Sequence, residues 1–382
     1  MFSIIKTTYN MKIFKTLSRI IIGLVFIFSG VVKAIDPMGS AYKFHDYFQA
    51  FHLGFLNNLS LTLAILLCTV EFISGFSLLT GFRQKAGIRV VATLLVIFTP
   101  LTFILALTNP VSDCGCFGDA IHLTNWQTFG KNIVLFLLLI VLFTGKNQIK
   151  SILAKTTEWI IIIIATVLFV IFSLANLRYL PVIDFLPYKS GVKIADKMMI
   201  PDGVPGDEYS TTFIYEKNGV KKNFNLSNYP ADDSTWIFVD QKSVLVKKGY
   251  EPPIHDFIIT ALNGEDLTQN ILSYSGYSVL MITKKLSEAG QRSLTEGFKL
   301  GNYCMANEIN FYILTSSGTD EVRTYENGLN FCSADETTLK SMVRANPGFI
   351  LLKDGTIIGK WSWANVPKME WFGELNRQSL IK

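Results

Sequence analysis

Ile20-Ile21-Ile22-Gly23-Leu24-Val25-Phe26-Ile27-Phe28-Ser29-Gly30-Val31-Val32 is an uncharged, largely apolar run near the start of the chain, and it decides the class of protein. It follows a basic leader, residues 1–16. A basic leader before an apolar run is typical of a secretory signal peptide and also of a first membrane helix. Because more apolar runs follow, we favour a transmembrane helix that is retained.

The composition supports a chain with a membrane half and a soluble half. Hydrophobic residues make up 49% of the sequence, charged residues 17%, and the mean hydropathy is +0.34. These values are too apolar for an ordinary soluble protein, and acidic residues become frequent only after about residue 184. A net charge of +5 without an arginine-rich stripe gives no reason to expect nucleic acid as a partner. Five cysteines are too few for a disulfide scaffold.

Four further apolar segments are each close to the length that crosses a bilayer. They cover about residues 59–81, 87–108, 127–144 and 157–177. Basic residues favour the cytoplasmic side of a membrane, and they occur in the leader and in two of the connections: Arg83, Lys85, Arg89, Lys146, Lys150 and Lys155. We therefore expect a multi-pass protein of a bacterial inner membrane, with its N-terminus in the cytoplasm and its C-terminal part in the periplasm.

The connection between the third and fourth spans holds the sequence Asp113-Cys114-Gly115-Cys116-Phe117-Gly118-Asp119. It contains two of the five cysteines and lies in a region without Lys or Arg, which places it on the outer side. Two thiols separated by one glycine can close a tight disulfide ring, and strained disulfides are easier to reduce than structural ones. Cys114 and Cys116 are therefore the first candidates for redox chemistry.

Glu71 lies inside the second apolar span. A carboxyl group at that depth costs several kcal/mol unless it has a partner, a cavity or a proton, so an intramembrane acid is a functional candidate. The alternative is a buried structural hydrogen bond, for example to Arg19, Ser29 or Lys33. We assign Glu71 together with the two cysteines to the candidate catalytic site.

The soluble part begins with a β-rich connector, residues 181–248. An Asn218-Gly219 turn predicts a β-hairpin, and residues 236–239 and 243–246 resemble a second pair of strands. Strands and helices alternate from about residue 249 onward. We expect strands at 277–283, 309–315 and 329–332, a helix after Asp335, a final hairpin over 349–361, and a helix near 367–376.

This last region, residues 249–382, resembles a thioredoxin-like domain of the TlpA and peroxiredoxin type. The resemblance rests on the order of strands and helices, on the Asn263-Gly264 turn after a first strand over 249–259, and on Pro347 before the final hairpin. It implies a cis-proline at Pro347 and a Cys-x-x-Cys pair after Thr283. The chain has Lys284-Lys285-Leu286-Ser287 there instead. Cys304 and Cys332 could form a structural disulfide or remain free.

The membrane part resembles the DoxX-like group and, within it, the methylamine-utilisation MauE family. The resemblance covers about residues 12–145 and rests on Phe28-Ser29-Gly30 with Lys33, on Glu71 followed by Gly75, and on the Cys114-Gly115-Cys116-Phe117-Gly118 loop. It implies a four-helix membrane domain, residues 17–146, with a role in disulfide formation or redox maturation of exported proteins. A fifth transmembrane helix, within residues 147–180, would then join it to the soluble part.

Two hypotheses remain open. The first is a thiol–disulfide relay in which Cys114 and Cys116 cycle, Glu71 carries protons, and an exported client protein is the partner. Its electron acceptor is unassigned; a membrane quinone is one candidate, although no quinone site is recognisable in the sequence. The second is a non-catalytic, membrane-anchored binding or scaffold module in which the cysteine loop is a static staple. We expect no metal site, because the loop offers only two soft ligands.

Overall fold

The computed structural model describes residues 2–111, 113–143, 153–231, 233–247, 249–325 and 328–380, with side chains between 11 and 377 within those ranges. Five of the described helices are long and apolar enough to cross a membrane, which confirms the expected number. They are α1 (Phe2–Ile35), α3 (Ser60–Thr80), α4 (Gln84–Thr108), α5 (Asn125–Phe143) and α6 (Lys155–Tyr179). Lys146 and Lys150, used above for orientation, lie outside the described residues.

Two helices form the centre of the membrane domain. A Cβ atom on Gly30 of α1 would lie 2.7 Å from the backbone oxygen of Cys68, and one on Gly75 of α3 would lie 2.6 Å from the oxygen of Gly23. Small residues at such points allow helix backbones to approach closely, a common way of packing helices in membranes. Helix α6 joins this pair through Phe169, whose ring stacks on Phe72 with centroids 4.1 Å apart.

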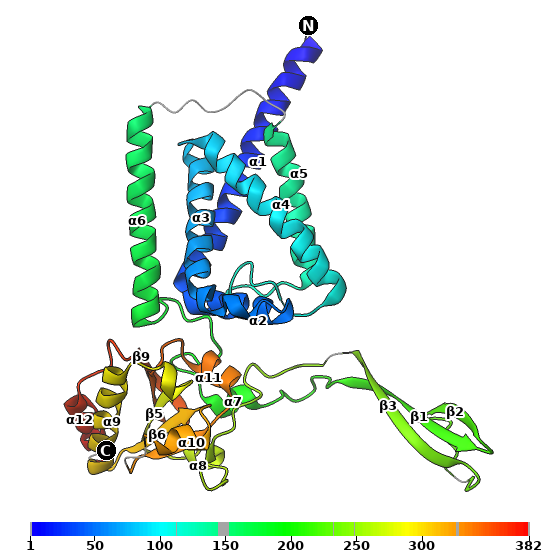
Figure 1. The fold of residues 1–382 in the computed structure, drawn as a ribbon, viewed down its shortest axis with the longest axis vertical. Helices are drawn as coiled ribbons and strands as arrows, with labels where there is room; N and C mark the ends of the chain where they lie inside the picture. Colours follow the sequence, from blue (N-terminus) through cyan, green and yellow to red (C-terminus); the bar gives the residue numbers. More distant parts are fainter. Residues whose placement is uncertain are drawn as a thin grey trace.

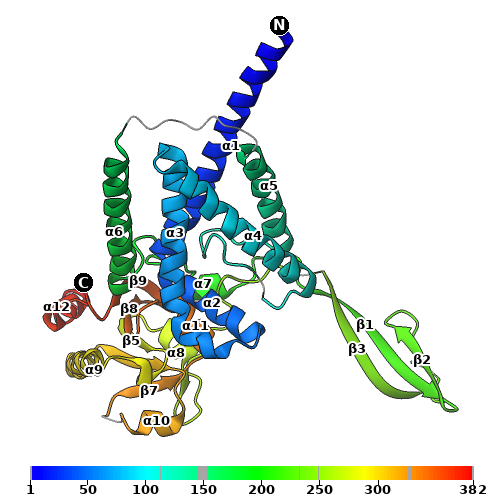
Figure 2. The same ribbon diagram turned by 45° about the horizontal axis from the view of Figure 1, so that its top comes forward.

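A short helix lies across one end of the bundle (Figure 1). This helix, α2 (Pro37–Ala50), begins at Asp36, whose carboxylate accepts a hydrogen bond from the Gly39 amide. A 3₁₀ turn, η1 (Gly54–Leu59), leads from it into α3. The cysteine loop between α4 and α5 lies at the same end, as does everything after α6 (Figures 1 and 2). The loop and the soluble part therefore share one side of the helices.

The C-terminal domain is built on a six-stranded sheet with the order β4-β7-β6-β5-β8-β9. The strands β5, β6 and β7 are parallel, and β8 and β9 form the antiparallel hairpin. Side chains of β5 alternate between the two faces: Leu280 and Ile282 join one core, Val279 and Met281 the other. The strand bounds are β4 (Thr260–Ala261), β5 (Tyr277–Thr283), β6 (Asn310–Thr315), β7 (Asn330–Ser333), β8 (Gly348–Lys353) and β9 (Thr356–Ser362).

Helices cover both faces of this sheet, as the thioredoxin-like resemblance implies. Leu339 of α11 and Ile271 of α8 pack in one core, whereas Leu294 of α9 and Phe372 of α12 pack in the other. The Asn346-Pro347 bond before β8 is cis, as expected. The helix bounds are α7 (Ile194–Met198), α8 (Thr268–Leu272), η2 (Leu286–Glu288), α9 (Gln291–Ala306), α10 (Thr319–Arg323), α11 (Glu336–Met342) and α12 (Met369–Leu380).

A separate three-stranded sheet projects from the connector as an arm (Figure 1). It consists of β1 (Glu208–Lys217), β2 (Val220–Asn225) and β3 (Ile237–Lys247), in the order β2-β1-β3. The Asn218-Gly219 hairpin joins β1 to β2 as predicted. The prediction of a second hairpin was wrong: residues 237–239 and 243–246 belong to one continuous strand, β3, which pairs with β1, and Trp236 precedes it. The register shift near Ile214 accommodates the extra residues of that long strand.

One further expectation for the C-terminal domain was wrong, and the structure decides between the two alternatives left open for Cys304 and Cys332. The segment 249–259 forms no strand; only Thr260 and Ala261 pair, with β7. Cys304 and Cys332 are both free and buried. They belong to the hydrophobic cores on opposite faces of the sheet, so the sheet separates them and no disulfide can join them.

The soluble domain meets the membrane domain at the end of the sheet where thioredoxin-like proteins carry their cysteines. Arg344 is buried and forms ion pairs with Asp36, at 2.8 Å, and with Asp119 of the cysteine loop. The Tyr42 ring of α2 faces three cations, those of Arg344, Lys340 and Lys284, at 4.9 to 5.6 Å from its centroid. This end of the sheet is therefore covered by α2 and the cysteine loop of the same chain.

Candidate functional site

An ion pair between two membrane helices forms the base of the site. The ammonium of Lys33 on α1 lies 2.7 Å from Oε1 and 2.8 Å from Oε2 of Glu71 on α3, and both side chains are buried. The Ser29 hydroxyl lies between them, 2.9 Å from Glu71 Oε2 and 3.0 Å from Lys33 Nζ. Glu71 therefore pairs with two of the three partners considered above. Arg19 is not one of them, and its Nε and Nη1 have no partner among the described residues.

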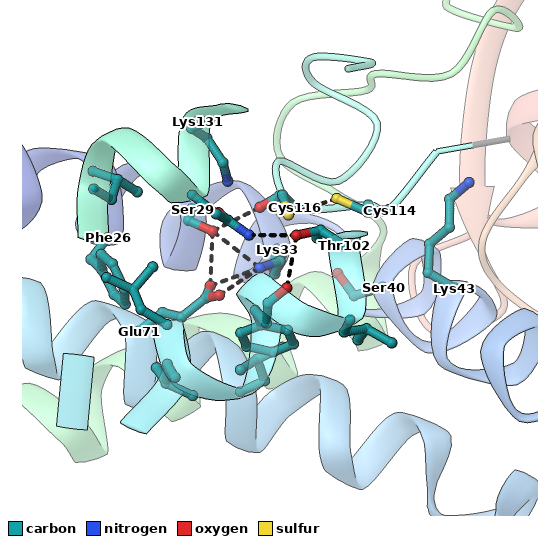
Figure 3. Close-up of a pocket in the computed structure, with 18 of the residues that line it drawn as sticks. Phe26, Ser29, Lys33, Ser40, Lys43, Glu71, Thr102, Cys114, Cys116 and Lys131 are labelled. Carbon is teal, nitrogen blue, oxygen red and sulfur yellow. Dashed lines mark hydrogen bonds and ion pairs between the residues drawn. The ribbon is translucent and has the colours of Figure 1, made fainter. Parts of the chain in front are cut away.

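The cysteine loop lies directly on this network (Figure 3). The backbone oxygen of Cys116 is 2.7 Å from the Ser29 hydroxyl, so the loop connects to the ion pair through one side chain. Tyr47 of α2 donates a hydrogen bond of 2.6 Å to the Cys114 carbonyl. Gly115 has a positive φ of 63°, and a Cβ atom there would lie 2.8 Å from Lys43. The loop requires glycine at this position.

Asp113 holds the start of the loop in place. Its carboxylate accepts hydrogen bonds from Lys43, at 2.9 Å, and from the Gly115 amide, at 2.8 Å, and lies 3.6 Å from His122. Burial by itself would raise the pKa of Asp113. The hydrogen bonds and charges of His122 and Lys43 outweigh burial and hold this pKa well below its usual range. An ionised Asp113 therefore ties the loop to α2 at neutral pH.

The two cysteines are free thiols with their sulfur atoms 2.7 Å apart. The hydrogen bond from Cys114 lowers the pKa of Cys116 to about 6. Burial by itself would raise this pKa, whereas the positive charges of Lys131 and Lys33 lower it further. The same hydrogen bond and burial raise the pKa of Cys114. At neutral pH the pair therefore carries one thiolate, on Cys116, and thiolates are the nucleophiles of disulfide exchange.

A cavity of about 110 Å³ adjoins the sulfur atoms and extends between the membrane helices. Its polar end is formed by Lys33, Glu71 and Cys116, with Lys131 of α5 beside them (Figure 3). Its remaining wall is mainly apolar, from α1, α3, α4 and α5: Val25, Phe26, Leu67, Leu94, Leu95, Phe98, Leu101, Leu105 and Leu135. Glu71, Cys114 and Cys116, the three residues predicted for the site, all line this one cavity.

Several residues of the site had no signal of their own in the sequence. Lys131 and Tyr47 are an ordinary interfacial lysine and tyrosine until the fold brings them to the loop. Arg344 lies 225 positions from Asp119. No group of three or more His, Cys, Asp or Glu side chains within the described ranges could hold a metal ion.

Comparison with known proteins assigns the two regions separately. Residues 11–145 match the family model described as methylamine utilisation protein MauE. Residues 209–248, the projecting arm, match a domain of unknown function (DUF8463). No curated protein matches the chain. The chain thus has a MauE-like membrane region, and the glycines and ion pair described above lie inside it.

Solved structures similar to the chain include thiol–disulfide proteins, each matched over about a third of it. One is a secreted Mycobacterium tuberculosis disulfide oxidoreductase, 18% identical over 33% of this chain and 96% of its own, with a TM-score of 0.25. Another is StoA from Bacillus subtilis, 13% identical over 31% and 93%, with a TM-score of 0.25. A third is the thioredoxin domain of a thiol-disulfide oxidoreductase from Bacteroides vulgatus, 11% identical over 32% and 91%, with a TM-score of 0.26. The strand order and the cis-proline identify the C-terminal domain of this chain as thioredoxin-like.

Proposed function

We propose that the protein is a membrane thiol–disulfide oxidoreductase that uses Cys114 and Cys116 to form disulfides in exported proteins. The observation that carries the proposal is the pair of free thiols, Cys114 and Cys116, whose sulfur atoms lie 2.7 Å apart in a loop that contacts the buried Lys33–Glu71 pair through Ser29. In the oxidised state the Cys114–Cys116 disulfide would accept a thiolate of the client. The client's second thiolate then closes its own disulfide, and both electrons remain on the Cys114–Cys116 dithiol.

Glu71 is proposed to carry protons in this cycle. Oxidation and reduction of a dithiol release and take up two protons, and the site is enclosed by membrane helices. Glu71, Lys33 and Ser29 form a continuous hydrogen-bonded chain that ends at the Cys116 carbonyl. This arrangement supports a path for protons between the loop and the interior of the bundle.

We further propose that the loop faces the periplasm of a bacterial inner membrane. The basic residues favour that orientation, and an oxidising compartment is where such a disulfide can form and persist. The soluble domain lies on the same side as the loop, so one orientation places both in the compartment of the client.

The alternative is a binding or scaffold module, and one observation favours it. The thioredoxin-like domain has Lys284-Lys285-Leu286-Ser287 directly after β5 in place of a Cys-x-x-Cys pair, and the corresponding face is occupied by α2 and the loop. A domain of this kind cannot exchange disulfides by itself. In this alternative the cysteine loop would be a closed staple.

A redox titration in intact cells decides between the two. The cells are equilibrated over a series of glutathione poises, and free thiols are trapped with a membrane-impermeant alkylating reagent. The peptide with Cys114 and Cys116 is then analysed by mass. We expect labelling from outside the cell and a midpoint above about −230 mV, the range of dithiol oxidants. A disulfide that stays closed below about −300 mV would make the loop a staple. Labelling only after the cells are opened would contradict the orientation.

A further inference from the structure

The proposed function leaves one half of the cycle open, and the cavity beside Cys116 bears on it. After each client is oxidised, the Cys114–Cys116 dithiol must pass two electrons to an acceptor before it can act again. The cavity touches both cysteines at one end and runs between α1, α3, α4 and α5. An acceptor bound there would therefore be in contact with sulfur on one side and with membrane helices on the other.

The size and wall of the cavity restrict what it can hold. The cavity of about 110 Å³ has room for about seven to eleven waters, which is the space of one substituted ring. Leu94, Phe98 and Leu101 lie on one face of α4, since they are spaced by four and three residues. All three are only half-buried, so this wall reaches the outer surface of the helix. The cavity fits a small ring on an apolar tail that extends toward lipid.

Two hydrogen-bond donors face the cavity without a hydrogen-bond partner among the described residues. Ser40 of α2 is 6% exposed, and its hydroxyl has no partner. Lys131 of α5 lies over the Phe117 ring, 4.7 Å from its centroid, and forms no ion pair within the described part of the chain. Buried polar groups usually have partners, and ionisable residues inside membrane proteins commonly mark substrate pathways. An acceptor with oxygen atoms at its polar end would satisfy both.

We propose that this cavity binds the ring of a membrane-soluble quinone, with Ser40 and Lys131 as donors to its carbonyl oxygens and Cys116 beside the ring. The proposal rests on the proposed function and names its electron acceptor. Oxidation forms the Cys114–Cys116 S–S bond from the Cys116 thiolate and the Cys114 thiol, and it breaks the Cys114 S–H bond. Two electrons and the Cys114 proton pass to the quinone together with one proton from water, and its two carbonyl groups become the hydroxyl groups of a quinol.

Two other occupants are less consistent with the site. A lipid acyl chain would fill the apolar wall but leave Ser40 and Lys131 without partners. A soluble disulfide such as oxidised glutathione would pair with Lys131, but it has no apolar tail to pack against the α4 face. Both are outcomes of the test below.

The experiment uses the full chain in lipid nanodiscs, reduced and then freed of reductant. Decyl-ubiquinone is added, and the oxidation of Cys114 and Cys116 is followed by alkylation and mass. The same is done with oxidised glutathione. Leu101→Trp fills the cavity, and Leu107→Trp places the same side chain on the lipid-facing side of α4, where Leu107 is 61% exposed. Lys131→Met and Ser40→Ala remove the donors with little change in volume.

We expect decyl-ubiquinone to oxidise the parent and Leu107→Trp at similar rates. Oxidation of Leu101→Trp and Lys131→Met should be at least tenfold slower, while oxidised glutathione acts equally on the parent, Leu101→Trp and Leu107→Trp. Photolabelling with an azido-quinone should mark peptides of α4 and α5 in the parent, and labelling should be lost in Leu101→Trp. This readout does not depend on turnover, so a folded but inactive variant is still informative.

Three results would overturn the proposal, each in a distinguishable way. If decyl-ubiquinone leaves the parent reduced while oxidised glutathione closes the disulfide, the quinone is wrong and the thiol–disulfide function stands. Equal rates for Leu101→Trp and Leu107→Trp would mean that the cavity is not the binding site. If neither oxidant forms the disulfide, the proposed function itself fails.

Discussion

Cys116 is the residue on which the chemistry depends, and its environment makes a prediction about pH. Because its pKa is lowered to about 6, the thiolate persists at neutral pH and is lost only as the pH falls below that value. The apparent pKa belongs to the coupled pair. We therefore expect the alkylation rate of Cys116 to fall as the pH is lowered, with a midpoint near pH 6. In Cys114→Ala the midpoint should move up toward the ordinary thiol value of about 8.5.

The measurement is the pH dependence of iodoacetamide labelling, with Cys116 identified by mass. Cys304 serves as an internal control, because burial raises its pKa to about 12. A midpoint of the parent at the ordinary thiol value would show that Cys114 donates no hydrogen bond to a thiolate.

The Lys33–Glu71 pair makes a second prediction at the scale of single residues. Removing one member of a buried pair leaves an uncompensated charge and costs about 3–5 kcal/mol. Lys33→Met should therefore lower the temperature of thermal unfolding strongly. Glu71→Gln, which keeps an oxygen for Lys33 and Ser29, should lower it less. The double variant Lys33→Met/Glu71→Gln removes both charges and should recover part of the loss.

Activity separates a structural from a proton-carrying role of Glu71. If Glu71 carries protons, the double variant should exchange disulfides more slowly than the parent even though its stability is partly recovered. Parent-like exchange in that variant would leave the pair a purely structural one.

At the scale of elements, the close contact of α1 and α3 brings Lys33 to Glu71. In Gly30→Ala the new methyl group meets the Cys68 oxygen at 2.7 Å and the Phe72 nitrogen at 2.8 Å. Backbone atoms cannot move aside as a side chain does, so the helices must separate. We expect a marked loss of thermal stability and slower disulfide exchange.

Gly130→Ala on α5 is the matched control, because a Cβ atom there meets nothing within 4 Å. It replaces glycine in a helix with the better helix former and should be neutral or slightly stabilising. If the two variants unfold at the same temperature, the glycine contact does not hold α1 against α3.

At the scale of the whole molecule, Arg344 joins the soluble domain to the membrane domain. It is buried and bonded to both Asp36 and Asp119, so its loss leaves two carboxylates without a cation. Arg344→Met should release the domain from α2. Hydrogen exchange of residues 37–50 and 113–119 should then rise by at least tenfold, while the β5 and β6 amides stay protected.

Arg323→Met is the control, since its one ion pair among the described residues is with Asp320, three residues away on the surface. Such exposed pairs contribute about 0–1 kcal/mol. Unchanged exchange in Arg344→Met would mean that other contacts hold the two domains together.

The sequence by itself determined the local and periodic features of this protein. Five long apolar runs are sufficient to predict five membrane helices, because a bilayer admits few other structures. The Asn218-Gly219 turn, the Asp335 cap and the order of strands around Pro347 follow from local backbone preferences. Cys114, Cys116 and Glu71 stood out because thiols and acids are rare in such surroundings.

Only the tertiary structure decided what these residues touch. Residues 237–239 and 243–246 became one strand because β1 pairs along both of them across two register shifts, which short-range patterns do not reveal. The cavity arises where four helices diverge beside the loop, and Ser40 and Lys131 reach it from two of the surrounding elements. Arg344 meets Asp36 across 308 positions of sequence. Contacts of that range depend on how whole domains pack, and no local pattern in the chain records them.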